Sequence, residues 1–370
     1  MMEEGLYHLW FSAFVKLPKG IKTALLDYYG SMEALWLAPE RELSDIAGKE
    51  MAEQVVAGRE EDRIYEYGSR LAAGGISYVY PEHPDYPLSL MNIPDRPEIL
   101  YVKGDIRPLD KTDTKRLAIV GARKATAYGI HAVNQIIDGL AGYDIQIISG
   151  LAYGIDINAH KAALSHGMYT AAILGCGVDI VYPASHAGTY REMEMHGALI
   201  SEYLPGSNPE NWHFPLRNRI ISGLADAVLV VEAKEKSGSL ITADQALEQG
   251  REVYAVPGRI NDANSRGTNN LIKQGAAAVT CAADILSAFG MCDATGGNGG
   301  QMKLCDFSQA QITLAPEEKK VYSCVRLEPG HIDDICRASG LGVSDTLRIL
   351  CGLKIKGLIY EPVANIFSRK

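Results

Sequence analysis

Short apolar runs alternate with amphipathic helical patterns through residues 115–290 of the chain. The run Leu117–Val120 ends at Gly121, and apolar side chains then recur at helical spacing until Leu140. Strands that alternate with helices in this way are typical of a parallel sheet with helices on both faces. We therefore expect an α/β fold with a mostly parallel sheet, and its strands are Leu117–Val120, Ile145–Ile148, Thr170–Leu174, Ala198–Glu202, Ala227–Glu232, Glu252–Val256 and Ala277–Thr280.

The segment before this domain has a different pattern. Residues 1–70 predict small helices, with one ending at Gly30 and the next capped by Ser31, as in a helix-hairpin-helix or SAM-like unit. Such a unit either contacts DNA phosphates through its turn amides or serves as a packing module, and the sequence leaves both open. Two more apolar runs, within residues 75–105, predict strands that lead into the main domain, which we place at residues 75–290.

The C-terminal segment predicts a third unit. Residues 291–312 are rich in glycine and asparagine at their start and are typical of a linker. Residues 313–370 predict three helices, the third capped by Ser344, and a hairpin, which is the pattern of a winged helix. Three basic side chains favour duplex DNA binding by this unit: Arg348, Lys354 and Lys356. Three acidic side chains nearby would repel phosphate and favour protein docking instead: Asp333, Asp334 and Asp345.

Composition narrows the class of protein. The 370 residues carry a formal charge of −9, so any nucleic-acid site must be a local basic patch. Seven cysteines form no C-x-x-C pair, which favours a reducing, cytoplasmic location. The first ten residues lack the cationic region of a signal peptide, and no apolar run is long enough to span a membrane.

Small and basic residues follow the first two strands of the main domain. Gly121 and Arg123 follow one strand, Ser149 and Gly150 follow the next, and Lys161 comes early in the following helix. Ligands of open α/β sheets bind at the carboxyl ends of the strands, where helix N-termini attract anions. The sequence therefore predicts a phosphate-binding edge here.

Later turns extend this predicted edge. Arg217, Asn218 and Arg219 open a helical pattern, and arginine suits phosphate, with a pair of structural salt bridges as the alternative. Ser237-Gly238-Ser239 precedes another helix, and Lys273 follows the turns after the next strand. If these turns meet at one edge of the sheet, they form a continuous site.

Motifs for common cofactors are absent from the sequence. Gly121-Ala122-Arg123 is not the dinucleotide fingerprint, and no Walker-type phosphate loop occurs, so we expect no cofactor and no metal. Ser149, Asp156 and His160 suggest a hydrolase triad, but the G-x-S-x-G turn is missing. Helix capping for Asp156 and packing for His160 explain these residues better.

The chain resembles the DNA-processing protein A (DprA/Smf) family over most of its length. The resemblance rests on ordered motifs: VGARKATAYG, ISGLAYGIDINAHKAAL, AILGCGVDIVYP, ISEY, FPLRNRIISGLADAVLVVEA, SGSLITADQALEQGREVYAVPG and SRGTNNLIKQGA. It implies an extended Rossmann-like domain flanked by an N-terminal SAM-like domain and a C-terminal winged helix. Both flanking domains agree with the patterns at the two ends.

The resemblance also implies a function. Members bind single-stranded DNA without sequence specificity, dimerise, and load the RecA recombinase onto incoming DNA during natural transformation, where single-strand-binding protein is the barrier. The family is not known as an enzyme. Matched residue by residue, its DNA-binding positions are Arg123 and Lys161, with Arg217, Asn218 and Arg219, and we add Gly121, Ser149, Gly150 and Lys273 to the expected surface. Bases would stack on Tyr153, Trp212 or Phe214.

Two other classes of function compete with this interpretation. One is a nucleotide-processing enzyme of the phosphoribohydrolase type, but the P-G-G-x-G-T-x-x-E run of those enzymes is absent. The other is a sensor that binds a small nucleotide through the same turns. Release of free base would reveal the enzyme, and thermal shifts with mononucleotides alone would reveal the sensor.

Overall fold

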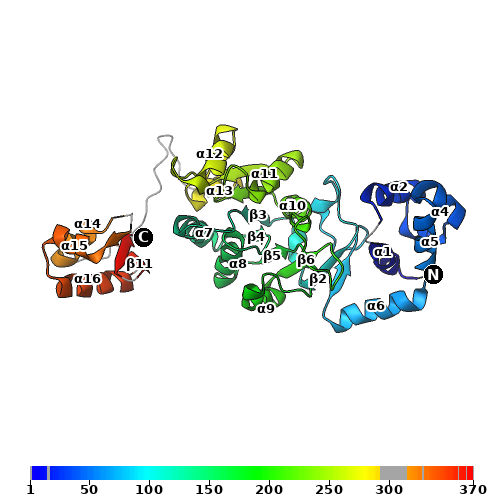
Figure 1. The fold of residues 1–370 in the computed structure, drawn as a ribbon, viewed down its shortest axis with the longest axis horizontal. Helices are drawn as coiled ribbons and strands as arrows, with labels where there is room; N and C mark the ends of the chain where they lie inside the picture. Colours follow the sequence, from blue (N-terminus) through cyan, green and yellow to red (C-terminus); the bar gives the residue numbers. More distant parts are fainter. Residues whose placement is uncertain are drawn as a thin grey trace. The chain divides into compact units, whose positions relative to one another are not determined.

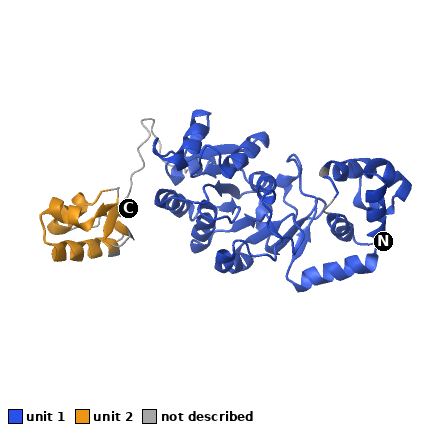
Figure 2. Ribbon diagram, viewed as in Figure 1, with its two compact units in different colours: residues 1–297 blue, residues 298–370 orange. Residues whose placement is uncertain are grey.

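The computed structural model describes residues 2–14, 17–291, 315–326, 329–356, 358–363 and 365–369. The chain divides into two compact units, residues 1–297 and 298–370 (Figure 2). The predicted linker, residues 291–312, lies outside the described residues except for Met291. No helix in the described part of the chain is long and apolar enough to cross a membrane.

The first unit begins with a helical bundle. Ser31 caps α3 as expected, because its side chain accepts a hydrogen bond from the Ala34 amide. The bundle's apolar side chains continue into the sheet domain, where Tyr101 and Leu199 belong to the same buried cluster. The N-terminal helices therefore share a core with the sheet, and they are α1 (Glu4–Ser12), α2 (Lys19–Tyr29), α3 (Met32–Leu37), α4 (Glu40–Ala47), α5 (Lys49–Ala57) and α6 (Glu61–Ala73).

A nine-stranded sheet forms the centre of this unit (Figure 1). Its order is β1-β2-β6-β5-β4-β3-β7-β8-β9. The pairs β1–β2 and β2–β6 are antiparallel, and every other pair is parallel, which confirms the mostly parallel α/β fold. The strands are β1 (Ser77–Val79), β2 (Leu100–Gly104), β3 (Lys115–Val120), β4 (Ile145–Ser149), β5 (Thr170–Ile173), β6 (Ala198–Ser201), β7 (Ala227–Val230), β8 (Glu252–Ala255) and β9 (Ala277–Ala278).

Helices cover both faces of the sheet, as expected for strands that are apolar on both sides. Buried side chains of α7, α8 and α13 form one core with the sheet, and those of α10, α11 and α12 form another. The helix α9 packs on β2, β5 and β6, and its Tyr190 and Met193 belong to the core that the sheet shares with the N-terminal helices. These helices are α7 (Ala127–Leu140), α8 (Ile155–Ser165), α9 (Ala187–His196), α10 (His213–Leu224), α11 (Gly238–Glu248), α12 (Arg266–Lys273) and α13 (Ala282–Ala288).

The second unit has its own apolar core, formed by helices and a small antiparallel sheet in the expected winged-helix pattern. Its strands pair in the order β10-β12-β11, so the predicted hairpin gains a third strand. Ser344 is not the cap of the third helix, because α16 begins one residue earlier and Gly342 precedes it. The elements are α14 (Pro316–Cys324), β10 (Gly330–His331), α15 (Ile332–Ser339), α16 (Val343–Ile355), β11 (Ile359–Val363) and β12 (Ile366–Arg369).

Candidate nucleic-acid interface

The order of the strands reverses at β3. The chain runs from β3 through β4 and β5 to β6 in one direction, and it then returns to place β7 on the other side of β3. The loops after β3 and β7 therefore separate at the carboxyl edge of the sheet, which is where open α/β sheets bind ligands. A hollow of about 400 Å³ lies at this point, lined by Gly121–Lys124 after β3 and Lys234 and Lys236–Ser239 after β7.

Four exposed cations line this hollow: Arg123, Lys124, Lys234 and Lys236. None of the four has an ion-pair partner among the described residues. The Arg123 guanidinium lies over the Phe214 ring, 5.1 Å from its centroid. The hollow therefore combines positive charge with an aromatic surface, the two features that hold a single strand of nucleic acid.

The sequence predicted Arg123 but missed the other three cations. Lys234 and Lys236 lie more than one hundred residues from Arg123 in the chain, and only the pairing of β7 with β3 brings them together. The hollow also contains the start of α11, where Ser237 caps the helix by accepting a hydrogen bond from the Ser239 amide. The Ser237 and Ser239 hydroxyls lie 2.8 Å apart at this helix N-terminus.

At two other helix N-termini, those of α7 and α8, protein groups already accept from some of the amides, and the phosphate contacts expected there stay a prediction. At α7 the carboxylate of Glu232 accepts hydrogen bonds from both the amide and the hydroxyl of Thr126. At α8 the Ile155 amide donates to the carbonyl oxygen of Ala122 at 3.2 Å. The start of α11 lines the hollow, together with the first turn of α10, through Phe214 and Pro215, and Asp156 of α8.

Arg217 is buried, which does not agree with its predicted role as an open phosphate contact. Its Nη1 atom donates to the carbonyl oxygens of Gly150, at 2.9 Å, and Ile173, and so links the ends of β4 and β5. Burial lowers the pKa of the guanidinium, and the nearby Asp156 carboxylate opposes this effect. With 3% of its surface exposed, Arg217 forms part of the wall of the hollow and supports the strand ends.

Ser149 and Gly150 are also buried instead of being open to a ligand. The Ser149 hydroxyl donates to the Ile119 carbonyl oxygen at 2.6 Å. A Cβ atom on Gly150 would lie 2.5 Å from Nη2 of Arg217, so this position needs glycine to admit the guanidinium. These two residues position the carboxyl ends of β3, β4 and β5, and the expectation of direct contact is corrected accordingly.

Arg219 faces away from the hollow. Its guanidinium forms a two-point ion pair with Glu202, with Nη1 2.8 Å from Oε1, and Nε donates to the Asp95 carbonyl oxygen at 2.8 Å. The side chain is 8% exposed. The salt-bridge alternative for this arginine is therefore the one that the structure contains.

Some of the other predicted residues line the hollow and some do not. Asn218 and Gly121 line the hollow, and a Cβ atom on Gly121 would lie 2.6 Å from Ile155, so glycine keeps the turn tight. Phe214 lines the hollow, whereas Trp212 and Tyr153 are exposed side chains that do not.

Lys161 and Lys273 do not line the hollow, although both are exposed. Lys161 lies in the second turn of α8, and Lys273 is the last residue of α12. Both helices begin at the carboxyl edge of the sheet, and each lysine lies further along its helix, away from that edge. A direct contact of either lysine with DNA stays a prediction.

The three residues of the suggested hydrolase triad do not form a relay. Ser149 donates to a backbone carbonyl, His160 Nδ1 pairs with the Thr170 hydroxyl at 2.7 Å, and Asp156 accepts from the Gly150 amide at 3.2 Å. Burial lowers the pKa of His160 to about 3, so the ring is neutral at physiological pH. The packing interpretation of His160 fits this environment.

The winged helix pairs the cations that suggested duplex binding. Arg348 lies 3.8 Å from Asp345, Lys354 lies 2.7 Å from Glu361, and Lys356 lies 2.7 Å from Glu318. The same helix exposes Val343 and Leu347, which are one turn apart. Each of the three cations thus has an acidic neighbour, on α16 for Arg348, on β11 for Lys354 and on α14 for Lys356, and this favours the protein-docking alternative over duplex DNA.

Known proteins resemble the chain in both sequence and structure. A Bacillus subtilis DNA processing protein DprA is 44% identical over 211 residues, which is 57% of this chain and 70% of that protein. The structure of DNA processing protein A from Streptococcus pneumoniae is 33% identical, has a TM-score of 0.67, and covers 78% of this chain and 98% of that one. A Helicobacter pylori DNA processing protein A structure, described for its single-stranded DNA binding mode, is 29% identical with a TM-score of 0.52, over 58% and 95% of the two chains.

Family comparison assigns the two parts of the chain separately. The family described as DNA recombination-mediator protein A matches residues 77–290, which include the nine strands of the sheet and the hollow at its edge. The DprA winged helix domain matches residues 306–361. On its motifs, its fold and these matches, the chain belongs to the DNA recombination-mediator protein A (DprA/Smf) family.

Proposed function

We propose that this protein binds single-stranded DNA, without sequence specificity, at the hollow where β3 and β7 diverge. The observation that supports this proposal is that four cations line the hollow together with Phe214 and have no ion-pair partner among the described residues. Phosphates lie against Arg123, Lys124, Lys234 and Lys236, and the N-terminus of α11 adds amide donors. None of these groups reads the edge of a base, which accounts for the lack of sequence specificity.

The charge of the hollow sets the expected salt dependence. If about four phosphates are neutralised, log affinity falls with log salt at a slope of roughly −3, at about 0.7 per phosphate for a single strand. A strongly acidic chain can still bind DNA in this way because the field of a concave patch is local. Base stacking on Phe214 would add about 1–3 kcal/mol.

The test is fluorescence anisotropy with labelled oligo-dT at several salt concentrations. Arg123→Ala and Lys236→Ala should each weaken binding about three- to tenfold and make the salt slope shallower by roughly 0.7. Lys111→Ala is the matched control, because this lysine is exposed, does not line the hollow and precedes β3, at the amino end of that strand. Equal losses in all three variants would refute the placement of the site, and binding of mononucleotides in preference to oligo-dT would favour the sensor.

We further propose that the bound strand is passed to the RecA recombinase, as the family resemblance implies, and that the protein acts as a homodimer. Single-strand-binding protein is then the competitor that must be displaced. The measurement is RecA filament assembly on strands coated with single-strand-binding protein, with Arg123→Ala as the DNA-binding-deficient control. Sedimentation of the free protein measures the dimer separately, and a monomer at micromolar concentration would contradict it.

A further inference from the structure

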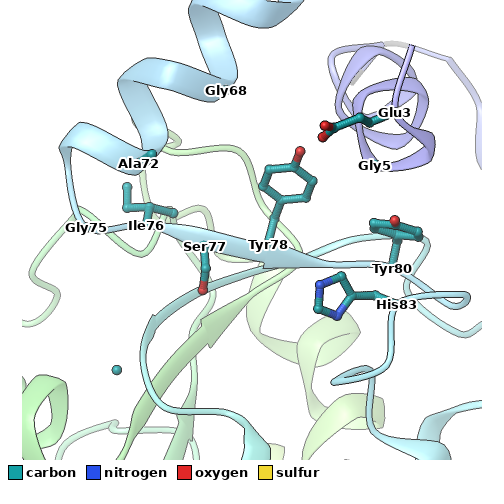
Figure 3. Close-up of a pocket in the computed structure, with 11 residues that line it drawn as sticks. Glu3, Gly5, Gly68, Ala72, Gly75, Ile76, Ser77, Tyr78, Tyr80 and His83 are labelled. Atoms are coloured by element: carbon teal, nitrogen blue, oxygen red, sulfur yellow. The ribbon is translucent and has the colours of Figure 1, made fainter. Parts of the chain in front are cut away.

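A second hollow, of about 640 Å³, is lined by residues of β1, the strand at the opposite edge of the sheet from β9. Figure 3 shows its lining residues. The hollow lies where β1 meets the helices α1 and α6, and it includes Tyr78, Tyr80, His83 and Glu3. No lysine or arginine is among the residues that line it. Its chemistry is therefore aromatic and acidic, in contrast to the cationic hollow proposed for DNA.

The hollow encloses the free edge of a strand. Among the described residues β1 pairs with β2 and with no other strand. Tyr78 points toward α1 and α6, whereas Ser77 points to the other side of the strand, and both line the hollow (Figure 3). Alternate residues of an edge strand direct their N–H and C=O groups outward, so an extended chain can pair with them.

The aromatic residues of this hollow are held in place. A Cβ atom on Gly5 would lie 2.9 Å from the Tyr80 ring and 3.1 Å from the Tyr78 ring, so α1 abuts both rings because this residue is glycine. The Tyr80 ring also stacks on His8 at 4.5 Å and meets His83 edge-on at 5.5 Å. Rings fixed in this way lose little freedom when a ligand arrives.

The charge around the rings selects a cation. Burial raises the pKa of Tyr80, and the negative charges of Glu4, Glu82 and Glu3 raise it further, so the phenol stays neutral. Glu3 is exposed at the rim of the hollow. A lysine or arginine side chain over a tyrosine ring gains from the ring quadrupole, and carboxylates nearby add attraction. The same carboxylates repel phosphate.

We propose that the free edge of β1 binds an extended, basic peptide segment of a partner protein. The segment adds a strand to the sheet and places a lysine or arginine side chain against Tyr78 and Glu3. This site is separate from the DNA hollow, because it lies at the β1 end of the sheet and not between β3 and β7. The two proposals therefore succeed or fail independently.

The test uses the full chain and a fluorescein-labelled peptide, acetyl-(Val-Lys)4-amide, followed by anisotropy. Binding at micromolar concentration is expected, with at least fivefold weaker binding in Tyr78→Ala and in Glu3→Gln. Tyr78→Phe keeps the ring and should bind as the wild type does. Only every second amide of the bound peptide faces β1, so N-methylation of alternate amides can be done in two ways. The peptide methylated on the amides that face β1 should not bind, because it has lost the N–H groups of the strand hydrogen bonds.

Controls separate this site from folding and from DNA. Tyr143→Ala removes an exposed tyrosine outside the hollow and should not change peptide binding. Oligo-dT affinity and the melting midpoint should stay at wild-type values in Tyr78→Phe and Glu3→Gln. Equal binding of acetyl-(Val-Glu)4-amide, or no binding below millimolar concentration, would overturn the proposal.

Discussion

Arg219 provides the sharpest test of the difference between the sequence motif and the structure. The family motif matches this arginine to DNA binding, whereas the structure places its guanidinium against Glu202 and Asp95. Arg219→Ala leaves the Glu202 carboxylate, which is 19% exposed, without its two-point partner. Removing one member of a buried ion pair lowers the free energy of unfolding by about 3–5 kcal/mol, because the other charge stays buried without a partner. We expect the lower end, about 3 kcal/mol, because Glu202 keeps some solvent and the attraction of Lys22.

Thermal unfolding by circular dichroism measures this cost. A loss of about 1 kcal/mol lowers the midpoint by roughly 2–4 °C in a domain of this size, so Arg219→Ala should melt about 6–12 °C lower. Oligo-dT affinity measured well below that midpoint should not change. The double variant Arg219→Met with Glu202→Leu should recover most of the stability, because no unpaired charge then remains. An unchanged midpoint together with tenfold weaker DNA binding would refute the structural assignment of Arg219.

Two further predictions concern the residues behind the hollow. Gly150→Ala should lower the free energy of unfolding by about 1–3 kcal/mol, because the new Cβ displaces the Arg217 guanidinium from its carbonyl partners. Urea unfolding measures this loss. A stability equal to that of the wild type would show that the guanidinium has room to move. His160 has a pKa of about 3 in the folded state against 6.5 in its ordinary state, so the unfolded chain binds the proton first as pH falls. The contribution of His160 to the free energy of unfolding should therefore be fully present above pH 6.5. It should decline as the pH falls toward 3, by up to about 1.4 kcal/mol per pH unit. His160→Gln should flatten that decline between pH 6.5 and 5, and an unaltered slope would assign the effect to other groups.

Local patterns in the sequence determined the elements of this protein. The apolar run Leu117–Val120 is a buried strand, and the helical spacing that follows Gly121 gives α7, because both patterns act over a few neighbouring residues. The carboxyl edge of a parallel sheet as the place of the site also follows from these patterns. Arg123 could therefore be identified from its position just after a strand.

Strand order and helix orientation belong to the tertiary structure alone. Lys234 and Lys236 join Arg123 because β7 lies beside β3, and nothing in the local sequence states this pairing. Arg217 and Arg219 differ from Arg123 because α10 lies on the sheet and buries both guanidinium groups among protein acceptors. Sequence can thus place a cation at a strand end, but whether that cation meets solvent or a carboxylate depends on contacts between residues far apart in the chain.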